Sequence, residues 1–255
     1  MDLVIAANSD LMGREAAQIA AVDLVAAIKN SGQARLLVAT GASQFTVLEH
    51  LIQHDEIDWS VVDGFHLDEY EGISPDHPAS FCKYLKERFV DRVGLRSFRF
   101  LRGDQDIEAT VSEAAAAVSA APIDVAMVGI GENAHLAFND PPADFETNDP
   151  YLIVDLDEAC RLQQVGEGWF DSLESVPKRA ISMSVNQILK SKRIVCSVPD
   201  ERKAKAVQGS FEGEICPKTP ASILQRHPQT TLLVDEPAAS LLSAESKEKA
   251  RKVQS

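Results

Sequence analysis

Short apolar runs rich in β-branched residues alternate along the chain with longer stretches that have helical spacing. Buried apolar strands separated by helices are typical of a largely parallel sheet. The candidate strands are LVIAAN from Leu3, RLLVAT, a strand within WSVVDGFHLDEY, FRFL, IDVAMVGIG, YLIVDL, RAISMSV, KRIVCSVP and TTLLVDE. The pattern predicts an α/β fold, a single-domain three-layer sandwich whose largely parallel, Rossmann-like sheet is covered by helices on both faces.

The segments between these runs have the spacing of amphipathic helices. Helices are predicted from about Asp10 to Asn30, through SQFTVLEHLIQH, from about Ser80 to Val93, through DIEATVSEAAAAVSA and through DERKAKAVQGSF. No low-complexity linker and no repeat of solenoid length divides the sequence. We therefore assign residues 1–242 to one domain and expect residues 243–255, which are polar and charged, to form a frayed, solvated helical tail.

Composition narrows the class of protein. The chain has 255 residues, of which 45% are hydrophobic and 25% charged, and no apolar run approaches the ~18 residues typical of a membrane span. The amino terminus lacks the basic region of a signal peptide, so we expect a cytoplasmic protein. The formal net charge of −14 argues against nucleic acid or a membrane as a partner. An anionic ligand would need a local cluster of donors.

The four cysteines are widely separated and form no CxxC pair. This spacing argues against a structural zinc site and against a disulfide framework. We expect reduced thiols.

The first candidate site follows the strand RLLVAT, in the segment VATGASQFTVLEHL. Ligands of open α/β sheets bind at the carboxyl ends of the strands. Gly41 makes a turn there, and Ser43 and Thr46 lie at the start of a helix. Backbone N–H groups and hydroxyls in this place can hold a phosphate, helped by the helix dipole. Alternatively, Ser43 only caps the helix.

The second candidate site lies in VVDGFHLDEYEGISPDHPAS, where Asp68 and Glu69 follow an apolar strand. Adjacent residues of a strand point to opposite faces, so the two acids are not expected to share one site. A carboxylate in this position can act as a general base on a carbon next to a carbonyl. The alternative is an acidic turn without function. His66 and His77 lie nearby, but no known ligand spacing supports a metal site.

The third candidate site is GIGENAHLAFNDPP, residues 129–142, which follows another apolar strand. We expect its two glycines to permit an unusual backbone and its prolines to stiffen the exit. If the strands are parallel, His135 lies at the same end of the sheet as Asp68. Imidazole titrates near neutral pH and suits sugar-ring opening or protonation of a leaving group. Asn133 and Asp140 are expected to orient it.

Together these segments resemble the glucosamine-6-phosphate deaminase (isomerase) family, which shares a fold with 6-phosphogluconolactonases. The similarity runs from TGAS through FHLDEYEGISPDHPASF, GIGENAHLAFNDPP and VPKRAISMSV to KAKAVQGSFEG and ILQRHPQTTLLVDEPAA. The DEY segment with its following HPxSF and the GxGxxxHxAFNxP segment are specific in combination. The lactonase branch ordinarily lacks AFNxP, so the chain looks closer to the deaminases.

The resemblance implies a catalytic role for each polar residue of the second and third sites. Asp68 matches the general base at C2 of the opened amino sugar, and His135 matches the acid/base that opens the ring. Asn133 and Asp140 lie beside this histidine. The implied reaction converts glucosamine 6-phosphate and water to fructose 6-phosphate and ammonia. It needs no metal or organic cofactor, because the sugar carbonyl activates its own neighbouring carbon.

The resemblance also implies where the sugar phosphate binds. Thr40, Gly41 and Ser43 fall in the phosphate-binding turn, and Lys203 matches a phosphate-contacting lysine. Taken alone, Lys203 would be interpreted as a solvated helix lysine.

Three positions depart from the family pattern. Asn133 stands where deaminases commonly have an aspartate, and an amide cannot stabilise an imidazolium by charge. Asp140 replaces a longer glutamate. A phosphate-gripping arginine is replaced by Gly168 or a neighbour, and Arg161 lies close by in sequence but out of register. These changes are compatible with a different amino sugar phosphate, an altered pH profile or reduced activity.

The sequence is also compatible with two other functions. A lactonase would use His135 to activate water and would give Asp68 no role at C2. A non-catalytic sugar-phosphate sensor would need a DNA-binding segment or a partner, and the acidic chain shows no helix-turn-helix. The sequence also leaves open the C4 epimer of the substrate and a possible homo-oligomer.

Overall fold

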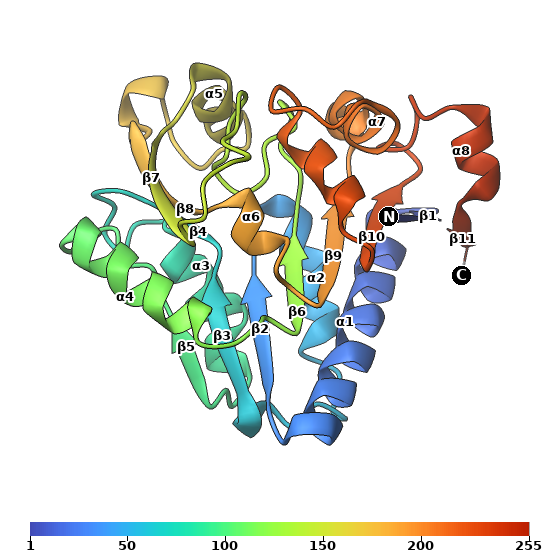
Figure 1. Ribbon diagram of the computed structural model, residues 1–255. Helices are drawn as coiled ribbons and strands as arrows, with labels where there is room; N and C mark the ends of the chain where they lie inside the picture. Colours follow the sequence, from blue (N-terminus) through green and yellow to red (C-terminus); the bar gives the residue numbers. More distant parts are fainter. Residues whose placement is uncertain (255) are drawn as a thin grey trace.

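The centre of the computed structural model, which describes residues 1–254, is an eight-stranded sheet in which all neighbouring strands run parallel. The strand order is β11-β1-β10-β9-β6-β2-β3-β5 (Figure 1). The strands are β1 (Asp2–Ala6), β2 (Ala34–Val38), β3 (Val62–His66), β5 (Ser97–Arg99), β6 (Val125–Val128), β9 (Arg193–Val198), β10 (Thr230–Asp235) and β11 (Arg251–Val253). The predicted α/β fold with a largely parallel sheet is confirmed.

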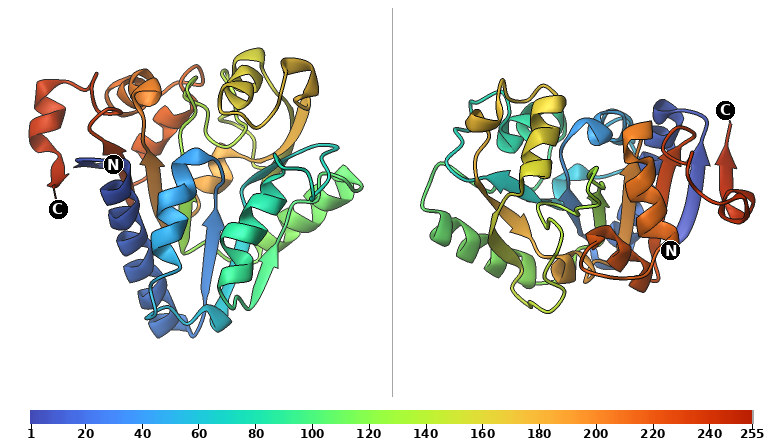
Figure 2. Two further views of the ribbon diagram at one scale, coloured as in Figure 1. Left: turned by 180° about the vertical axis from the view of Figure 1, so that it is seen from behind. Right: turned by 90° about the horizontal axis from the view of Figure 1, so that it is seen from above.

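Helices cover both faces of this sheet, as predicted. One face carries α1 (Ser9–Ser31), α2 (Phe45–Leu51) and α3 (Phe81–Arg88), which lie in front in the left view of Figure 2. The other face carries α4 (Ile107–Ser119), α6 (Val185–Ile188) and α7 (Ala204–Glu212), in front in Figure 1. The short 3₁₀ helices are η1 (Ala42–Gln44), η2 (Trp59–Val61), η3 (Val90–Arg92), η4 (Leu173–Ser175), η5 (Glu201–Lys203) and η6 (Pro220–Arg226).

The core forms on both sides of the sheet because side chains alternate along each strand. Leu37 of β2 packs into the apolar layer under α4 and α6, whereas Leu36 and Val38 pack under α1. Each such fully buried side chain contributes about 1.5–3 kcal/mol to folding. Gly13 of α1 makes a close approach possible, since a Cβ there would lie 2.4 Å from Thr46 Oγ1. This contact packs the start of α2 against α1.

Three strands form a second, antiparallel sheet with the order β4-β8-β7. They are β4 (Asp68–Tyr70), β7 (Tyr151–Asp155) and β8 (Arg179–Met183). β4 follows β3 after the single residue Leu67, so the segment predicted to hold one strand holds two. The antiparallel pairing of β7 fits its partly exposed residues, because strands of parallel sheets are buried on both faces. With α5 (Glu158–Gly166), which was not predicted, this sheet stands above one end of the parallel sheet (Figure 1).

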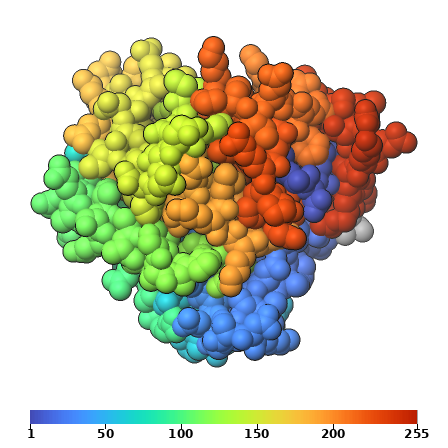
Figure 3. Space-filling model, viewed as in Figure 1, coloured from blue at the N-terminus to red at the C-terminus, as the bar shows by residue number. Residues whose placement is uncertain are grey.

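The end of the chain adds both a helix and an edge strand. α8 (Ala244–Lys249) forms within the segment expected to be helical, but β11 was not expected. β11 pairs in parallel with β1, with Val4 opposite Arg251. The segment RKV shows no apolar pattern, because this edge strand is held by backbone pairing and keeps its charges in solvent. Figure 3 shows this red segment packed beside the blue amino-terminal segment.

The topology fixes where a ligand can bind. β2 leads to β3 on one side, whereas the chain after β6 returns to β9 on the other side. Connections that leave two neighbouring strands in opposite directions open a crevice at the carboxyl ends of those strands. Among the described residues, no helix is long and apolar enough to cross a membrane.

Candidate active site

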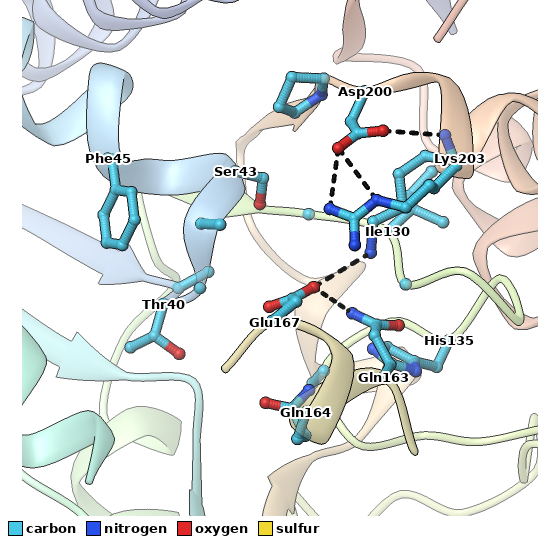
Figure 4. A pocket seen from close by; sticks show the side chains of 18 of the residues that line it. Thr40, Ser43, Phe45, Ile130, His135, Gln163, Gln164, Glu167, Asp200 and Lys203 are labelled. Atoms are coloured by element: carbon cyan, nitrogen blue, oxygen red, sulfur yellow. Dashed lines mark hydrogen bonds and ion pairs between the residues drawn. The ribbon is translucent and has the colours of Figure 1, made fainter. Parts of the chain in front are cut away.

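A cavity of about 500 Å³ lies at this crevice between β2 and β6. Its volume falls within the ~300–1,000 Å³ of small-molecule sites. The predicted residues that line it are Thr40, Gly41, Ser43, Asp68, His135 and Lys203, several of which are labelled in Figure 4. Asn133 and Asp140 contact His135 from the side away from the cavity. The three segments singled out in the sequence therefore meet at one place.

The pleat of β4 separates Asp68 from Glu69, as predicted. Asp68 lines the cavity, whereas Glu69 accepts hydrogen bonds from Ser80 Oγ at 2.9 Å and from the backbone N–H of Cys82 at 2.7 Å. Glu69 thereby satisfies free N–H groups at the start of α3. Its role is structural, and the two acids do not share a site.

Asp68 is a buried carboxyl whose exposed fraction is 6%. Burial, and to a lesser extent the charge of Glu69, raises its pKa to about 8. Within residues 1–254, its Oδ1 has no hydrogen-bond partner. A carboxylate that lines the cavity, titrates near neutral pH and is not held by a hydrogen bond at Oδ1 is suited to take and return a proton.

The raised pKa of Asp68 predicts a pH-dependent stability. Between its ordinary pKa of 3.8 and about 8, the folded protein holds a proton that the unfolded chain releases. The free energy of unfolding should therefore fall by about 1.4 kcal/mol per pH unit in this window because of this group. We expect Asp68→Asn to remove that slope, so that it raises the melting temperature more at pH 8 than at pH 5. An equal effect at both pH values would contradict the raised pKa.

The backbone of the His135 loop is unusual, but not at the expected residues. Positive φ occurs at Ala134 (66°) and Ala137 (54°), which is strained for residues with a side chain. Gly131 instead provides room, because a Cβ there would lie 2.2 Å from His135 Nε2. Neither Gly129 nor Gly131 has a positive φ, so the expectation that these two glycines permit the unusual backbone was wrong. At Gly131 the requirement is close packing of the imidazole.

Asp140 lies beside the imidazole. His135 Nδ1 and Asp140 Oδ1 are 3.3 Å apart, and the Asp140 side chain is only 8% exposed. Burial by itself would raise the pKa of Asp140, but His135, the Asn133 amide and the Asp157 backbone N–H together hold it below its ordinary value. Asp140 is thus a charged partner behind the ring.

Asn133 acts on the ring indirectly. Its Oδ1 accepts the backbone N–H of His135 at 3.1 Å, and its Nδ2 donates to Asp140 Oδ1 at 3.0 Å. The amide therefore orients the histidine through its backbone and through Asp140.

The opposite end of the cavity is formed by the turn after β2. Gly41 has a φ of 91° and leads into η1, which contains Ser43. The N-cap of α2 is Gln44, so Ser43 does not cap that helix. Gly129 has no side chain to block Ser43, since a Cβ there would lie 3.0 Å from Ser43 Oγ. The hydroxyl is positioned at the cavity wall.

Lys203 is buried at the same end. Its side chain is 8% exposed, and Nζ lies 3.8 Å from Glu167 Oε1 (Figure 4). Burial lowers the pKa of Lys203, and the nearby Glu167 opposes this shift. The interpretation of Lys203 as a solvated helix lysine is therefore wrong.

Sequence reasoning missed several lining residues. Arg202 reaches the cavity beside Lys203 while its guanidinium donates to Asp200 Oδ2 at 2.8 and 3.1 Å. Glu167 is held by Gln163 Nε2 at 2.8 Å and by the indole N–H of Trp169 at 3.2 Å. The only signal for Arg202 in the sequence is its position next to Lys203, since charged residues at a helix start are usually solvated.

Neither Arg161 nor Gly168 provides a phosphate-binding guanidinium in the cavity. The Arg161 guanidinium donates to the backbone oxygens of Leu173 and Val176, which ties α5 to η4. Gly168 has a φ of 80° just beyond α5. Its neighbour Glu167 places a carboxylate in the cavity. The two cationic residues that line this end of the cavity are Lys203 and Arg202.

One group of side chains within residues 1–254 has the spacing of possible metal ligands. The ligand atoms of His135, Asp140 and Cys160 lie within 4.8 Å of one another. Burial raises the pKa of the Cys160 thiol well above its usual value, which keeps the sulfur protonated and makes it a poor ligand. The geometry fits a histidine held by a carboxylate better than a metal centre.

Comparison with known proteins identifies the family of this chain. A profile described as "Glucosamine-6-phosphate isomerases/6-phosphogluconolactonase" matches residues 7–233. The chain belongs to this family. Two of its relatives in the family are glucosamine-6-phosphate deaminases. That of Exiguobacterium sibiricum is 37% identical over 215 residues, covering 84% of this chain and 83% of the relative. That of Thermoanaerobacter pseudethanolicus is 33% identical over 252 residues and 96% of each chain.

Solved structures of the family agree with this assignment. A monomeric glucosamine-6-phosphate deaminase superimposes with a TM-score of 0.84 at 33% identity, covering 94% of this chain and all of that one. A 6-phosphogluconolactonase from Shewanella baltica superimposes with a TM-score of 0.75 at 20% identity, covering 92% and 98%. The second likeness shows the shared fold alone. The resemblance that the motifs indicated is confirmed.

Proposed function

We propose that the protein is an aldose-ketose isomerising deaminase, a hydrolase that converts glucosamine 6-phosphate or a close hexosamine 6-phosphate and water to fructose 6-phosphate or its epimer and ammonia. The observation that supports this most is the buried Asp68, whose pKa is raised and whose Oδ1 has no hydrogen-bond partner among the described residues, lining the same cavity as His135. The relatives named as glucosamine-6-phosphate deaminases support the same activity.

In the proposed mechanism, His135 first transfers a proton between the C1 hydroxyl and the ring oxygen, which opens the pyranose to the aldehyde. The negative charge of Asp140 behind the imidazole stabilises the protonated ring in this step. Asp68 then removes the C2 proton, whose acidity comes from the adjacent carbonyl, and protonation of the carbonyl oxygen gives an enolamine. Asp68 next delivers a proton to C1, which leaves an iminium group at C2. Water adds to this carbon and ammonia leaves, giving the ketose.

The substrate phosphate is assigned to the other end of the cavity. Lys203 and Arg202 supply charge, and the turn formed by Thr40, Gly41 and Ser43 supplies hydroxyl and backbone donors. This local group of cations would allow a protein of net charge −14 to hold a sugar phosphate. Domain limits of 1–242, action in the cytoplasm and any homo-oligomer remain predictions, and a monomeric deaminase is among the structural neighbours.

A direct comparison of substrates tests the proposed function. The native protein would be incubated with glucosamine 6-phosphate, galactosamine 6-phosphate and 6-phosphogluconolactone, with ammonia and acid release measured in parallel. We expect ammonia from at least one hexosamine phosphate. Hydrolysis of the lactone without ammonia from either hexosamine phosphate would contradict the proposal, since lactone hydrolysis needs no base at C2.

The phosphate assignment predicts changes in KM. A hydrogen bond to a charged group contributes roughly 1.5–3 kcal/mol, so Lys203→Met and Arg202→Met should each raise KM for the hexosamine phosphate about 10- to 100-fold. Lys205→Met is the matched control, because this exposed lysine lies on α7 outside the cavity. KM is obtained for each variant from initial rates over a range of substrate concentrations. An unchanged KM in Lys203→Met would place the phosphate elsewhere.

A further inference from the structure

The amide of Asn133 lies between two carboxylates. Its Nδ2 donates to Asp140 Oδ1 at 3.0 Å and also lies 3.3 Å from Asp157 Oδ2, the second acceptor. Its Oδ1 accepts the backbone N–H of His135 at 3.1 Å. One side chain thus connects Asp157, Asp140 and His135.

Asp157 is held in place from its own helix. It is the N-cap of α5, and its Oδ1 accepts the backbone N–H of Cys160 at 2.5 Å. Its backbone N–H donates to Asp140 Oδ2 at 3.1 Å. With Oδ1 used by the cap, Oδ2 is left to face Asn133. Asp157 is therefore linked to Asp140 in two ways, by its own backbone N–H and through the side-chain amide of Asn133.

This arrangement fixes the orientation of the Asn133 amide. Only its NH₂ group can face two carboxylates, so the carbonyl oxygen must point toward the backbone N–H of His135. Without the Asp157 carboxylate, an amide flipped by 180° would lose one hydrogen bond to a carboxylate instead of two, so the observed orientation would be less strongly favoured. Asp157 also places a second negative charge in the group that lies behind the imidazole, where positive charge develops during proton transfer.

We propose that Asp157 is a positioning residue for His135, acting through Asn133 and Asp140 to hold the imidazole and to stabilise its protonated form. This inference rests on the proposed deaminase function. It explains why an amide occupies position 133, since a carboxylate there would lie within hydrogen-bond distance of both the Asp140 and the Asp157 carboxylates.

Asp157→Asn tests this role because asparagine is as good an N-cap as aspartate, so α5 keeps its start while the charge is lost. The structure predicts that kcat for the hexosamine phosphate falls about 10-fold, as expected for about 1.4 kcal/mol. The inhibition constant for inorganic phosphate should not change, since the phosphate end is untouched. An unchanged kcat would show that Asp157 is only a helix cap and would overturn the inference.

A double-variant comparison makes the test sharper. Asn133→Asp should lower kcat more than Asp157→Asn does, because it creates three adjacent carboxylates. Adding Asp157→Asn to Asn133→Asp restores two carboxylates and should raise kcat about 10-fold over Asn133→Asp alone. Adding Asp155→Asn instead should give no recovery, because Asp155 is an exposed acid on β7. Equal behaviour of the two double variants would contradict the coupling.

The same assay separates this inference from the proposed function. The native chain is measured first for ammonia release, and an inactive native chain would contradict the deaminase proposal itself. An active native chain whose kcat does not respond to Asp157→Asn contradicts only the role given to Asp157. Thermal unfolding of each variant identifies loss of folding as a separate result.

Discussion

Asp68→Asn is expected to lower kcat for hexosamine 6-phosphate deamination by about 10³-fold or more, within the range for loss of a general base. Asparagine keeps the shape of the side chain but cannot accept the C2 proton. KM should change little, because Asp68 lies away from Lys203 and the phosphate turn. The measurement is ammonia release by the purified variant at saturating substrate, with the melting temperature as the check on folding.

Glu69→Gln is the control for this prediction. Glu69 supports the start of α3 from the other side of β4, so the variant should lose stability while a folded sample keeps a kcat close to native. The native enzyme should also show kcat/KM that rises with pH up to about 8, because the free enzyme must have Asp68 ionised to act as a base. Substantial turnover by Asp68→Asn would exclude Asp68 as the base.

His135→Gln is expected to lower kcat by about 10²- to 10⁴-fold, the usual range for removal of an acid/base group. Glutamine keeps a polar side chain near Asp140 but does not carry a proton between the C1 hydroxyl and the ring oxygen. The residual rate should approach that supported by the small open-chain fraction of the sugar in solution. Steady-state rates measured beside His54→Gln, a change at a histidine outside the cavity, provide the comparison. A His135→Gln enzyme with native kcat would show that ring opening needs no help from this residue.

Much of the parallel sheet could be predicted from sequence because its strands are apolar on both faces and separated by helices of clear period. The same signal does not distinguish β7 and β8 from strands of the parallel sheet. Their antiparallel pairing, β4 with β8 and β8 with β7, depends on contacts between segments far apart in the chain. β11 was not predictable because its pairing with β1 uses backbone groups and its side chains show no pattern.

The residues of the candidate site were also predictable only in part. Alternation along a strand was sufficient to separate Asp68 from Glu69, and strand ends were sufficient to bring His135 to the same edge. Glu167, Arg202 and Asp157 could not be recognised, because each is an ordinary charged residue at a helix end until the fold places it. The amide at Asn133, which departs from the family pattern, has a physical reason once Asp157 is seen beside it.

The most direct test of the central claim is the conversion of glucosamine 6-phosphate in D₂O, followed by proton NMR together with an ammonia assay. The account predicts equimolar ammonia and fructose 6-phosphate, with deuterium at C1 of the ketose because Asp68 exchanges its proton with solvent before returning it, and no conversion by Asp68→Asn. Ammonia without a ketose product, or conversion that Asp68→Asn retains, would contradict the account.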